Sequence, residues 1–285
     1  LQKRQFSVHW EIINNFGADI LRIWVGASDY SEDLKIGPEI IKHQADAYRR
    51  LRNTFRYLLG NLDGFDDSER VRFEDMPELE RFVLHRLAEL DELVRNCCEK
   101  YDFHTMFIAL HNFCAVDLSS FYFDIRKDTL YCDTVDSFDR RASRTVLDQL
   151  YMSLTAWLAP IIPFTTEEAW LTRFPEDDEK GSVHLREFPN VQTDWRDEAL
   201  AAKWQLVRNL RRVVTGALEV ERAEKRVGSS LGAEAIIYAP QSYHQSLKEI
   251  NLADLCITSS AYFSDDEAPA HAFHISETVS YTHLT

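Results

Sequence analysis

Lysine and arginine side chains are concentrated in short stretches of an otherwise acidic sequence. Between Lys42 and Arg56, five Lys or Arg residues stand against one Asp, which gives a local charge of +4. The planar guanidinium group of arginine is suited to binding phosphate. Within this stretch the polar positions Arg49, Arg52, Asn53 and Arg56 recur with helical spacing, so they form one stripe. We expect the stripe to lack neutralising carboxylates, although a solvated helix face is the alternative.

Two further groups of cations could do similar chemistry. One lies late in the chain and comprises Arg208, Arg211, Arg212, Arg222, Lys225 and Arg226. The other, Arg126 and Lys127, is interleaved with the aromatic residues Phe121, Tyr122, Phe123 and Tyr131. Cations among aromatic rings suit single-stranded RNA, whose bases stack on such rings for about 1–3 kcal/mol each. Part of this aromatic set must belong to the core, so the third group by itself is only suggestive.

The composition limits the kind of nucleic-acid binder this can be. The chain has 285 residues, a formal net charge of −15, 45% apolar residues and 28% charged residues. These values are typical of a globular protein and not of a disordered one. A charge of −15 excludes a generally basic protein that binds nucleic acid indiscriminately. Any binding must therefore depend on the local clusters.

Motifs of autonomous enzymes and metal sites are missing from the sequence. There is no Gly-rich phosphate loop, no Gly-x-Ser-x-Gly and no His-Glu-x-x-His, and we predict no catalytic residue in this chain. The absence of a Cys-x-x-Cys spacing leads us to predict no metal. No run approaches the roughly 18 apolar residues of a membrane helix. We expect no membrane partner, a cytoplasmic location and five cysteines that act as apolar fillers: Cys97, Cys98, Cys114, Cys132 and Cys256.

The elements that must position these residues are mostly helices. Apolar residues three or four apart predict helices over 45–62, 78–100, 105–125, 140–158 and 197–226, with a short one through 165–170. Asp75 resembles an N-cap, and Thr165 with Glu168 resembles a capping box. After Gly228 the pattern predicts strands at 235–239 and 255–258 around a helix at 242–250. The predicted fold class is mainly α, an antiparallel helix bundle with a small C-terminal α/β module.

Several ordered strings in the sequence resemble class I aminoacyl-tRNA synthetases for branched aliphatic amino acids. The strings are Gly17–Val25, Tyr48–Arg56, Phe121–Asp128 and Leu158–Trp170, and with Lys225–Leu231 they are most similar to the bacterial-type isoleucyl enzymes. The resemblance covers about residues 10–260. It implies an anticodon-binding bundle at 44–195, preceded by the end of a catalytic core or stem-contact segment at 1–43. It also implies a long helix plus a small module at 196–264. The stretch 265–285 has no usable period, so we expect it to be a disordered tail.

The resemblance further implies a role within a larger enzyme. Such an enzyme ligates isoleucine to its tRNA with ATP and Mg, and its catalytic and editing domains would lie outside this chain. Leu1–His9 does not match the KMSKS loop, and the zinc-binding cysteines of many bacterial relatives have no counterpart, so no cofactor is expected in this chain. The expected partners are isoleucine tRNA and the upstream catalytic domain, in a monomer. Residues 10–35 would then carry an exposed apolar face.

The resemblance assigns the RNA contacts residue by residue. Lys127 occupies the position that approaches the first anticodon base in the family, with Arg126 and Asp128 beside it. The remaining expected contacts are Arg49, Arg52, Asn53, Arg56, Arg222, Lys225 and Arg226. Two alternatives stay open: the same region of a valyl- or leucyl-tRNA synthetase, and a helical interaction protein with no RNA role. The second predicts basic stripes paired with carboxylates of neighbouring helices.

Overall fold

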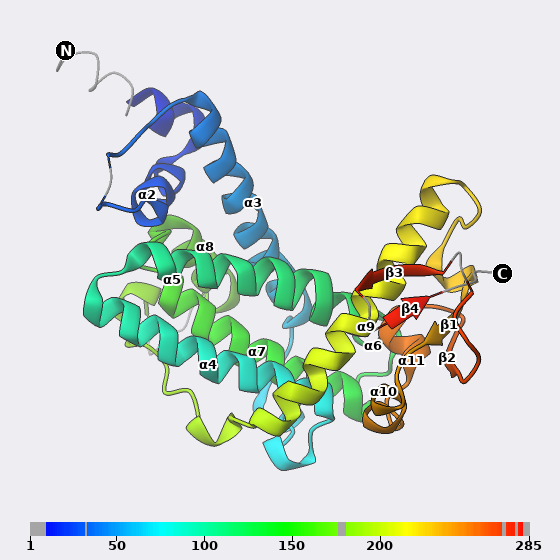
Figure 1. Cartoon of the computed structure of the whole chain (residues 1–285). Helices are drawn as coiled ribbons and strands as arrows, with labels where there is room; N and C mark the ends of the chain where they lie inside the picture. The colour runs from blue at the N-terminus through cyan, green and yellow to red at the C-terminus, as the bar shows by residue number, and fades with distance from the viewer. Residues whose placement is uncertain (1–9, 32, 176–180, 270–271, 277–278, 282–285) are drawn as a thin grey trace. The chain divides into compact units, whose positions relative to one another are not determined.

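The computed structural model describes residues 10–31, 33–175, 181–269, 272–276 and 279–281. The chain forms two compact units, Leu1–Arg196 and Asp197–Thr285. Helices dominate the first unit, and the second combines helices with a small sheet (Figure 1). The predicted class, mainly α with a small α/β module, is confirmed.

Long helices build the first unit. Residues 10–16 are helical. They are followed by α2 (Ala18–Ala27), α3 (Pro38–Asn61), α4 (Glu78–Lys100), α5 (Phe103–Asn112), α6 (Phe123–Cys132), α7 (Phe138–Leu158) and α8 (Pro163–Arg173). Single 3₁₀ turns lie at Asp67–Glu69, Phe73–Asp75, Val183–Leu185 and Thr193–Trp195. The predicted helices are thus present, with ends that differ by a few residues.

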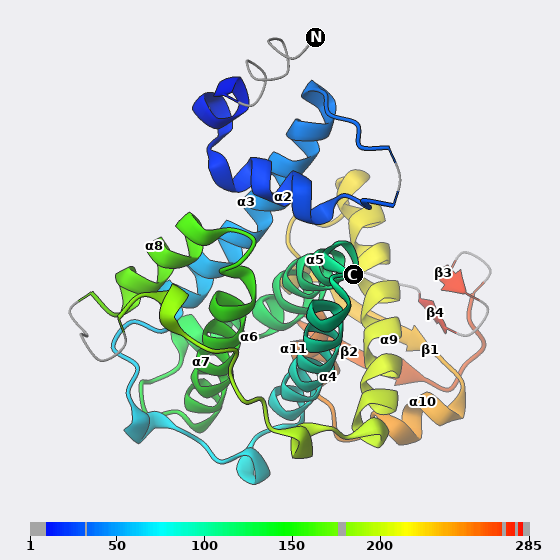
Figure 2. The same cartoon turned by 90° about the vertical axis from the view of Figure 1, so that its left-hand side faces the viewer.

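The core of the bundle lies where α3, α4, α7 and α8 meet. Helix α7 contacts α3, α4, α6 and α8, and Figure 2 shows α8 beside α3 and α7. Leu58 of α3, Leu87 of α4 and Trp157 of α7 are fully buried. In α3 the buried residues Leu51, Phe55 and Leu58 recur three or four positions apart, as the predicted helical period requires.

One helical segment departs from the α-helical period. Between α5 and α6, Phe113–Tyr122 forms a π-helix, so helical structure is continuous over residues 103–132. The hydroxyls of Ser119 and Ser120 donate to carbonyls five residues earlier. By length and composition alone, this stretch could cross a membrane, contrary to the sequence expectation, but half of its apolar window is buried inside the protein. Leu110 and Leu118 are among its fully buried side chains.

Two helix starts differ from the predicted caps. Asp75 ends a 3₁₀ turn and Pro77 is the N-cap of α4. Thr165 lies inside α8, where its amide and hydroxyl both bond to the buried carboxylate of Asp19, at 2.9 and 2.6 Å. A carboxylate on α2 therefore caps α8, which a local capping-box pattern cannot reveal. It also ties α2 into the same unit as the helices predicted at 44–195.

The second unit places a long helix against a four-stranded sheet. It contains α9 (Glu198–Ala223), a 3₁₀ turn at Ser230–Gly232, β1 (Glu234–Tyr238), α10 (Gln241–Ser246), α11 (Leu252–Cys256), β2 (Ser260–Ser264), β3 (Phe273–Ser276) and β4 (Val279–Tyr281). The strand order is β2-β1-β4-β3, with β1 parallel to β2 and antiparallel to β4. Glu234 pairs with Ser260, which sets the parallel register.

Two predictions for this unit are wrong. The apolar run 255–258, read as a strand, contains the end of α11, because Leu255 and Cys256 face the core from a short helix that Asn251 caps. The strand follows it instead, at Ser260–Ser264. The region 265–285, expected to be a disordered tail, contains β3 and β4; β4 pairs with β1, and β3 pairs with β4.

Candidate nucleic-acid interface

The outer face of α6 presents polar and aromatic side chains to solvent. Lys127 and Asp128 are exposed, and Tyr131 is 63% exposed. In the described part of the chain, neither the Lys127 side chain nor the Asp128 side chain makes a hydrogen bond or ion pair. Tyr131 follows Asp128 by three residues and Lys127 by four, so all three share one face of the helix. This face offers a cation, a carboxylate acceptor and an aromatic ring side by side.

Arg126 lies on the opposite side of the same helix. Its Nε and Nη2 donate to the two carboxylate oxygens of Glu80, at 2.7 and 2.6 Å. Glu80 is fully buried, and the Arg126 side chain is 16% exposed. Tyr122 and Ser143 also donate to the Glu80 carboxylate, each at 3.1 Å. The Arg126 guanidinium is therefore engaged inside the bundle, and Arg126 is not one of the RNA contacts proposed below.

The electrostatics of this buried pair favour its ionised form. Burial by itself would lower the pKa of Arg126, but the charge and hydrogen bonds of Glu80 outweigh it and the pKa is raised. Burial raises the pKa of the Tyr122 phenol, and the Glu80 charge adds to the effect. The phenol therefore stays protonated and can donate to Glu80. Both oxygens of the Glu80 carboxylate accept hydrogen bonds from side chains of the bundle.

Most of the aromatic residues near Lys127 belong to the core. Phe121, Tyr122 and Phe123 are buried. The Phe123 ring stacks on Tyr57 of α3, with ring centroids 4.1 Å apart. Of the four aromatic residues in the predicted cluster, only Tyr131 remains available for a base. Burial raises the pKa of the Tyr57 phenol, with smaller contributions from Tyr131 and Asp124.

The stripe on α3 is partly neutralised, which corrects the sequence expectation. Arg49 pairs with Asp46 at 2.5 Å. Arg52 donates to both oxygens of Glu168 on α8, at 2.7 and 3.0 Å. These hydrogen bonds lower the pKa of the Glu168 carboxyl. Asn53 and Arg56 are exposed and, among the described residues, have no such partner.

Asn53 and Arg56 border a pocket of about 260 Å³ between α3 and α8. Arg52, Glu168 and Thr172 also line it. The net charge of these side chains is +1, since Glu168 offsets one of the two arginines. A second pocket of about 320 Å³ shares Thr165 and Glu168 with the first and is also lined by Phe16 and Phe164. The α3 stripe is thus a weakly cationic surface.

The cations late in the chain divide into internal and external groups. Arg211 is buried and its Nε donates to the carbonyl of Leu255 at 2.8 Å, which fixes α11 to α9. Arg222 pairs with Glu219, and Arg226 pairs with Glu221 and Glu224. Lys225 has a left-handed backbone, with φ at 59°, at the end of α9. Its side chain is exposed and has no ion pair within the described ranges.

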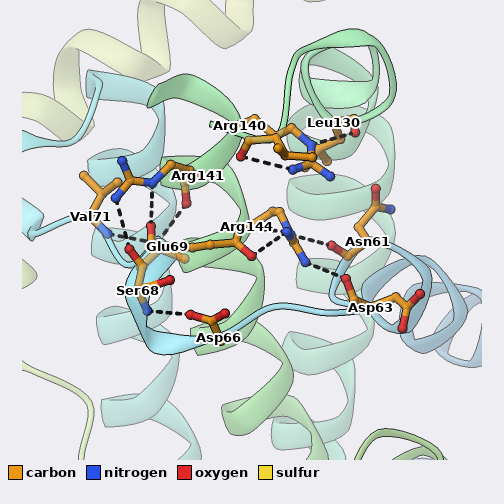
Figure 3. Close-up of polar contacts among 12 residues, drawn as sticks. Asn61, Asp63, Asp66, Ser68, Glu69, Val71, Leu130, Arg140, Arg141 and Arg144 are labelled. Atoms are coloured by element: carbon orange, nitrogen blue, oxygen red, sulfur yellow. Dashed lines mark hydrogen bonds and ion pairs between the residues drawn. The ribbon is translucent and has the colours of Figure 1, made fainter. Parts of the chain in front are cut away.

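Sequence reasoning missed three arginines at the start of α7. Arg140 donates to the carbonyls of Leu130 and Val135, and Arg141 to those of Ser68 and Glu69. Arg144 is buried, pairs with Glu69 and donates to the carbonyls of Asn61 and Asp63 (Figure 3). These three side chains hold the ends of α3 and α6 and the loop before α4. The spacing Arg140-Arg141-x-x-Arg144 could have marked these residues as a cationic cluster, but sequence alone does not distinguish arginines that hold loops in place from arginines that contact RNA.

Three of the five cysteines fit the predicted role of apolar filler, and the exposed Cys132 does not. All five are free thiols, and Cys97, Cys114 and Cys256 are buried while Cys132 is exposed. Burial raises the pKa of Cys114 and of Cys256 to about 12 in each case. These two thiols therefore remain protonated and unreactive at neutral pH.

Comparison with known proteins finds a matching domain family and close relatives of this chain. A family model described as the anticodon-binding domain of tRNA ligase matches residues 80–237. The isoleucine–tRNA ligases of Agrobacterium fabrum and Rhodopseudomonas palustris are 50% and 48% identical to the chain over 94% of its length. The chain spans 27% of the length of each of these relatives.

A solved structure supports the fold alone. It is the ternary complex of a leucyl-tRNA synthetase, LeuRS-tRNA-LeuAMS, from Agrobacterium radiobacter K84, with a TM-score of 0.50 and 16% sequence identity. The match covers 65% of this chain and 21% of the other. The helical bundle is therefore an architecture that has been seen in a synthetase.

Proposed function

The chain belongs to the anticodon-binding domain family of tRNA ligases, and from that premise we propose that it recognises the anticodon of isoleucine tRNA. The identity of 45–50% to isoleucine–tRNA ligases supports this choice over the valyl and leucyl enzymes. The whole enzyme would join isoleucine to tRNA with ATP and Mg in the cytoplasm. That chemistry would belong to the catalytic part of the enzyme, because this sequence contains no KMSKS string.

One observation carries the site assignment: Lys127 and Asp128 are exposed and unpaired in the described residues, on a helix whose opposite side is anchored by a buried ion pair. A free ammonium donates to base oxygens and nitrogens or to phosphate, and a carboxylate accepts from base amino groups. Tyr131 adds a ring on which a base can stack. Arg56 and Asn53 on α3, with Lys225 and the ion-paired Arg49, Arg52, Arg222 and Arg226, would contact the RNA backbone.

The segment before the bundle has a different proposed role. Trp10, Phe16, Val25, Tyr30 and Leu34 are all large apolar side chains with 45–68% exposure. An apolar surface of this kind is typical of a protein contact. We propose that residues 10–35 contact the catalytic part of the enzyme.

A helical interaction protein without an RNA role remains the second candidate. It is favoured by the carboxylates that pair with Arg49, Arg52, Arg222 and Arg226. This candidate predicts that isoleucine tRNA does not bind even at low salt.

The substitution Lys127→Ala tests the site assignment. We expect the ratio of affinities for isoleucine tRNA and for a variant with a changed first anticodon base to fall by about tenfold, the loss of one base contact of about 1–3 kcal/mol. Lys100→Ala is the matched control, since Lys100 is an exposed lysine at the end of α4. An unchanged ratio in Lys127→Ala would remove Lys127 from the site.

A further inference from the structure

The Glu80 carboxylate is the most completely engaged buried charge near the proposed site. It is inaccessible to solvent and accepts four hydrogen bonds, from Arg126 (two), Tyr122 and Ser143. These donors come from α6, the end of the π-helix and α7, while Glu80 itself lies in the first turn of α4. One carboxylate thereby fixes three helical segments at a single point.

The consequence for α6 follows from helical geometry. Successive residues of an α-helix are rotated by about 100°. With Tyr122 and Arg126 held against Glu80, and Leu130 buried one turn later, Lys127 and Asp128 must face outward. The preceding π-helix has a wider turn than an α-helix, so the residues of α5 do not set this rotation by periodicity alone. The Glu80–Arg126 pair supplies a directional constraint that apolar contacts lack.

A gain in stability is a poor explanation for such a pair. Removing two charges from water is costly, and apolar residues of similar volume often replace buried ion pairs with no loss of stability. A bidentate arginine–carboxylate contact instead has a fixed planar geometry. The pair is therefore better suited to specifying the orientation of α6 than to holding the bundle together.

We propose that Glu80 is a positioning residue for RNA recognition: through Arg126 it sets the rotation of α6 that presents Lys127 and Asp128 to a base. This inference rests on the proposed anticodon recognition. It adds a role for two internal residues that do not touch RNA. Its specific consequence is that the pair governs discrimination between RNAs more than it governs folding or the affinity for a tRNA with a changed anticodon.

The double variant Glu80→Met with Arg126→Met tests this directly. It removes both charges together, so neither is left buried and unpaired. For the folded variant we expect the affinity for the anticodon-changed tRNA to stay within about threefold of that of the unsubstituted chain, because the other cations remain, and the affinity for isoleucine tRNA to fall about tenfold to the same level. We expect the preference over the anticodon-changed tRNA, about tenfold for one base contact, to fall to about one.

Matched controls come from the same network. Tyr122→Phe and Ser143→Ala each remove one neutral donor from Glu80 and leave the ion pair in place. Binding is measured below the melting temperature of each variant, and circular dichroism confirms the fold. We expect both controls to keep the preference of the unsubstituted chain. A loss of preference in both controls equal to that of the double variant would assign the effect to general destabilisation and overturn the proposal.

A milder variant keeps the test decisive if the double variant does not fold. Arg126→Lys retains the buried positive charge but cannot form the bidentate contact. We expect it to fold and to lose several-fold in preference. If folded Arg126→Lys, or the folded double variant, keeps the full preference while Lys127→Ala loses it, the positioning role is wrong and anticodon recognition stands. If the unsubstituted chain shows no preference, the proposed function itself fails.

Discussion

Arg126 and Lys127 are adjacent in the chain but have opposite environments. The Arg126 guanidinium bonds to a fully buried carboxylate, whereas the Lys127 ammonium is exposed. The same division applies to the aromatic residues around them, since Phe121, Tyr122 and Phe123 are buried and Tyr131 is not. Sequence identified the group of residues because cations and rings cluster there. It could not separate the members, because Arg126 has the same chemistry as an RNA contact and only the position of Glu80, 46 residues away, decides its role.

Tyr131 provides a residue-scale prediction. Tyr131→Ala is expected to weaken binding of isoleucine tRNA by roughly tenfold, because one base loses a stacking partner worth about 1–3 kcal/mol. Tyr131→Phe keeps the ring and should bind normally. The control Tyr101→Ala removes another exposed tyrosine, at the end of α4. Equal affinities for Tyr131→Ala and the unsubstituted chain, measured by fluorescence anisotropy, would exclude stacking at this position.

The contact between Arg52 and Glu168 gives a pH dependence of known sign. The arginine's hydrogen bonds lower the pKa of Glu168 below its ordinary value of 4.5. A depressed carboxyl pKa contributes stability that is present above the unfolded-state pKa and disappears as pH falls through the folded-state pKa. Both side chains are about half exposed, so the effect is small.

We therefore expect the melting temperature of the unsubstituted chain to be slightly higher than that of Glu168→Gln at pH 7. This difference in melting temperature should vanish as the pH falls below about 4.5. Thermal unfolding followed by circular dichroism between pH 3 and 7 measures it. A difference that grows toward low pH would contradict the assigned contact.

At the scale of elements, periodicity predicted most of what the structure contains. The apolar spacing predicted α3, α4, α7 and α9, because their apolar residues recur three or four positions apart, although α7 is buried around most of its circumference. It predicted helix through Phe113–Tyr122 but not its π form, because apolar residues three to five apart do not by themselves distinguish a π-turn from an α-turn. It also misassigned 255–258, where four residues are too few to separate helix from strand. Contacts between distant elements, such as Asp19 with α8, leave no local pattern.

The Asp19 cap yields an element-scale prediction. Asp19 is buried and accepts from the amides of Phe164 and Thr165 and from the Thr165 hydroxyl. Asp19→Ala should lower the free energy of unfolding by about 1–3 kcal/mol, since it removes a cap and leaves buried donors unsatisfied. Asp46→Ala, which removes an exposed partner of Arg49, should change it by less than about 0.5 kcal/mol. Urea denaturation compares the two, and equal effects would show that the cap is unimportant.

At the scale of the whole molecule, a net charge of −15 coexists with a few exposed cations. Among the ten contact residues expected from the sequence, the cations that the structure leaves exposed without a carboxylate partner in the described ranges are Arg56, Lys127 and Lys225. Acidity over most of the surface opposes non-specific attraction to RNA. Binding would then depend on a small number of contacts, which suits selection of one tRNA among many.

The dependence of the tRNA dissociation constant on salt concentration measures the number of contacts between cations and RNA. With about three phosphate or base contacts from free cations, log Kd should rise with log salt concentration at a slope of about 2–3. Titration of isoleucine tRNA at several salt concentrations gives the slope, and Arg56→Ala should lower it by about one. A slope above about 6 would indicate diffuse attraction to a basic surface, contrary to the charge distribution found here.

The central claim is that this chain recognises an anticodon, and one comparison tests it most directly. The unsubstituted chain is titrated with isoleucine tRNA and with the same tRNA changed only at the first anticodon base, in the same buffer. Anticodon recognition predicts that the unchanged tRNA binds about tenfold or more tightly. Equal affinity for the two RNAs, or no binding of either at low salt, would contradict it.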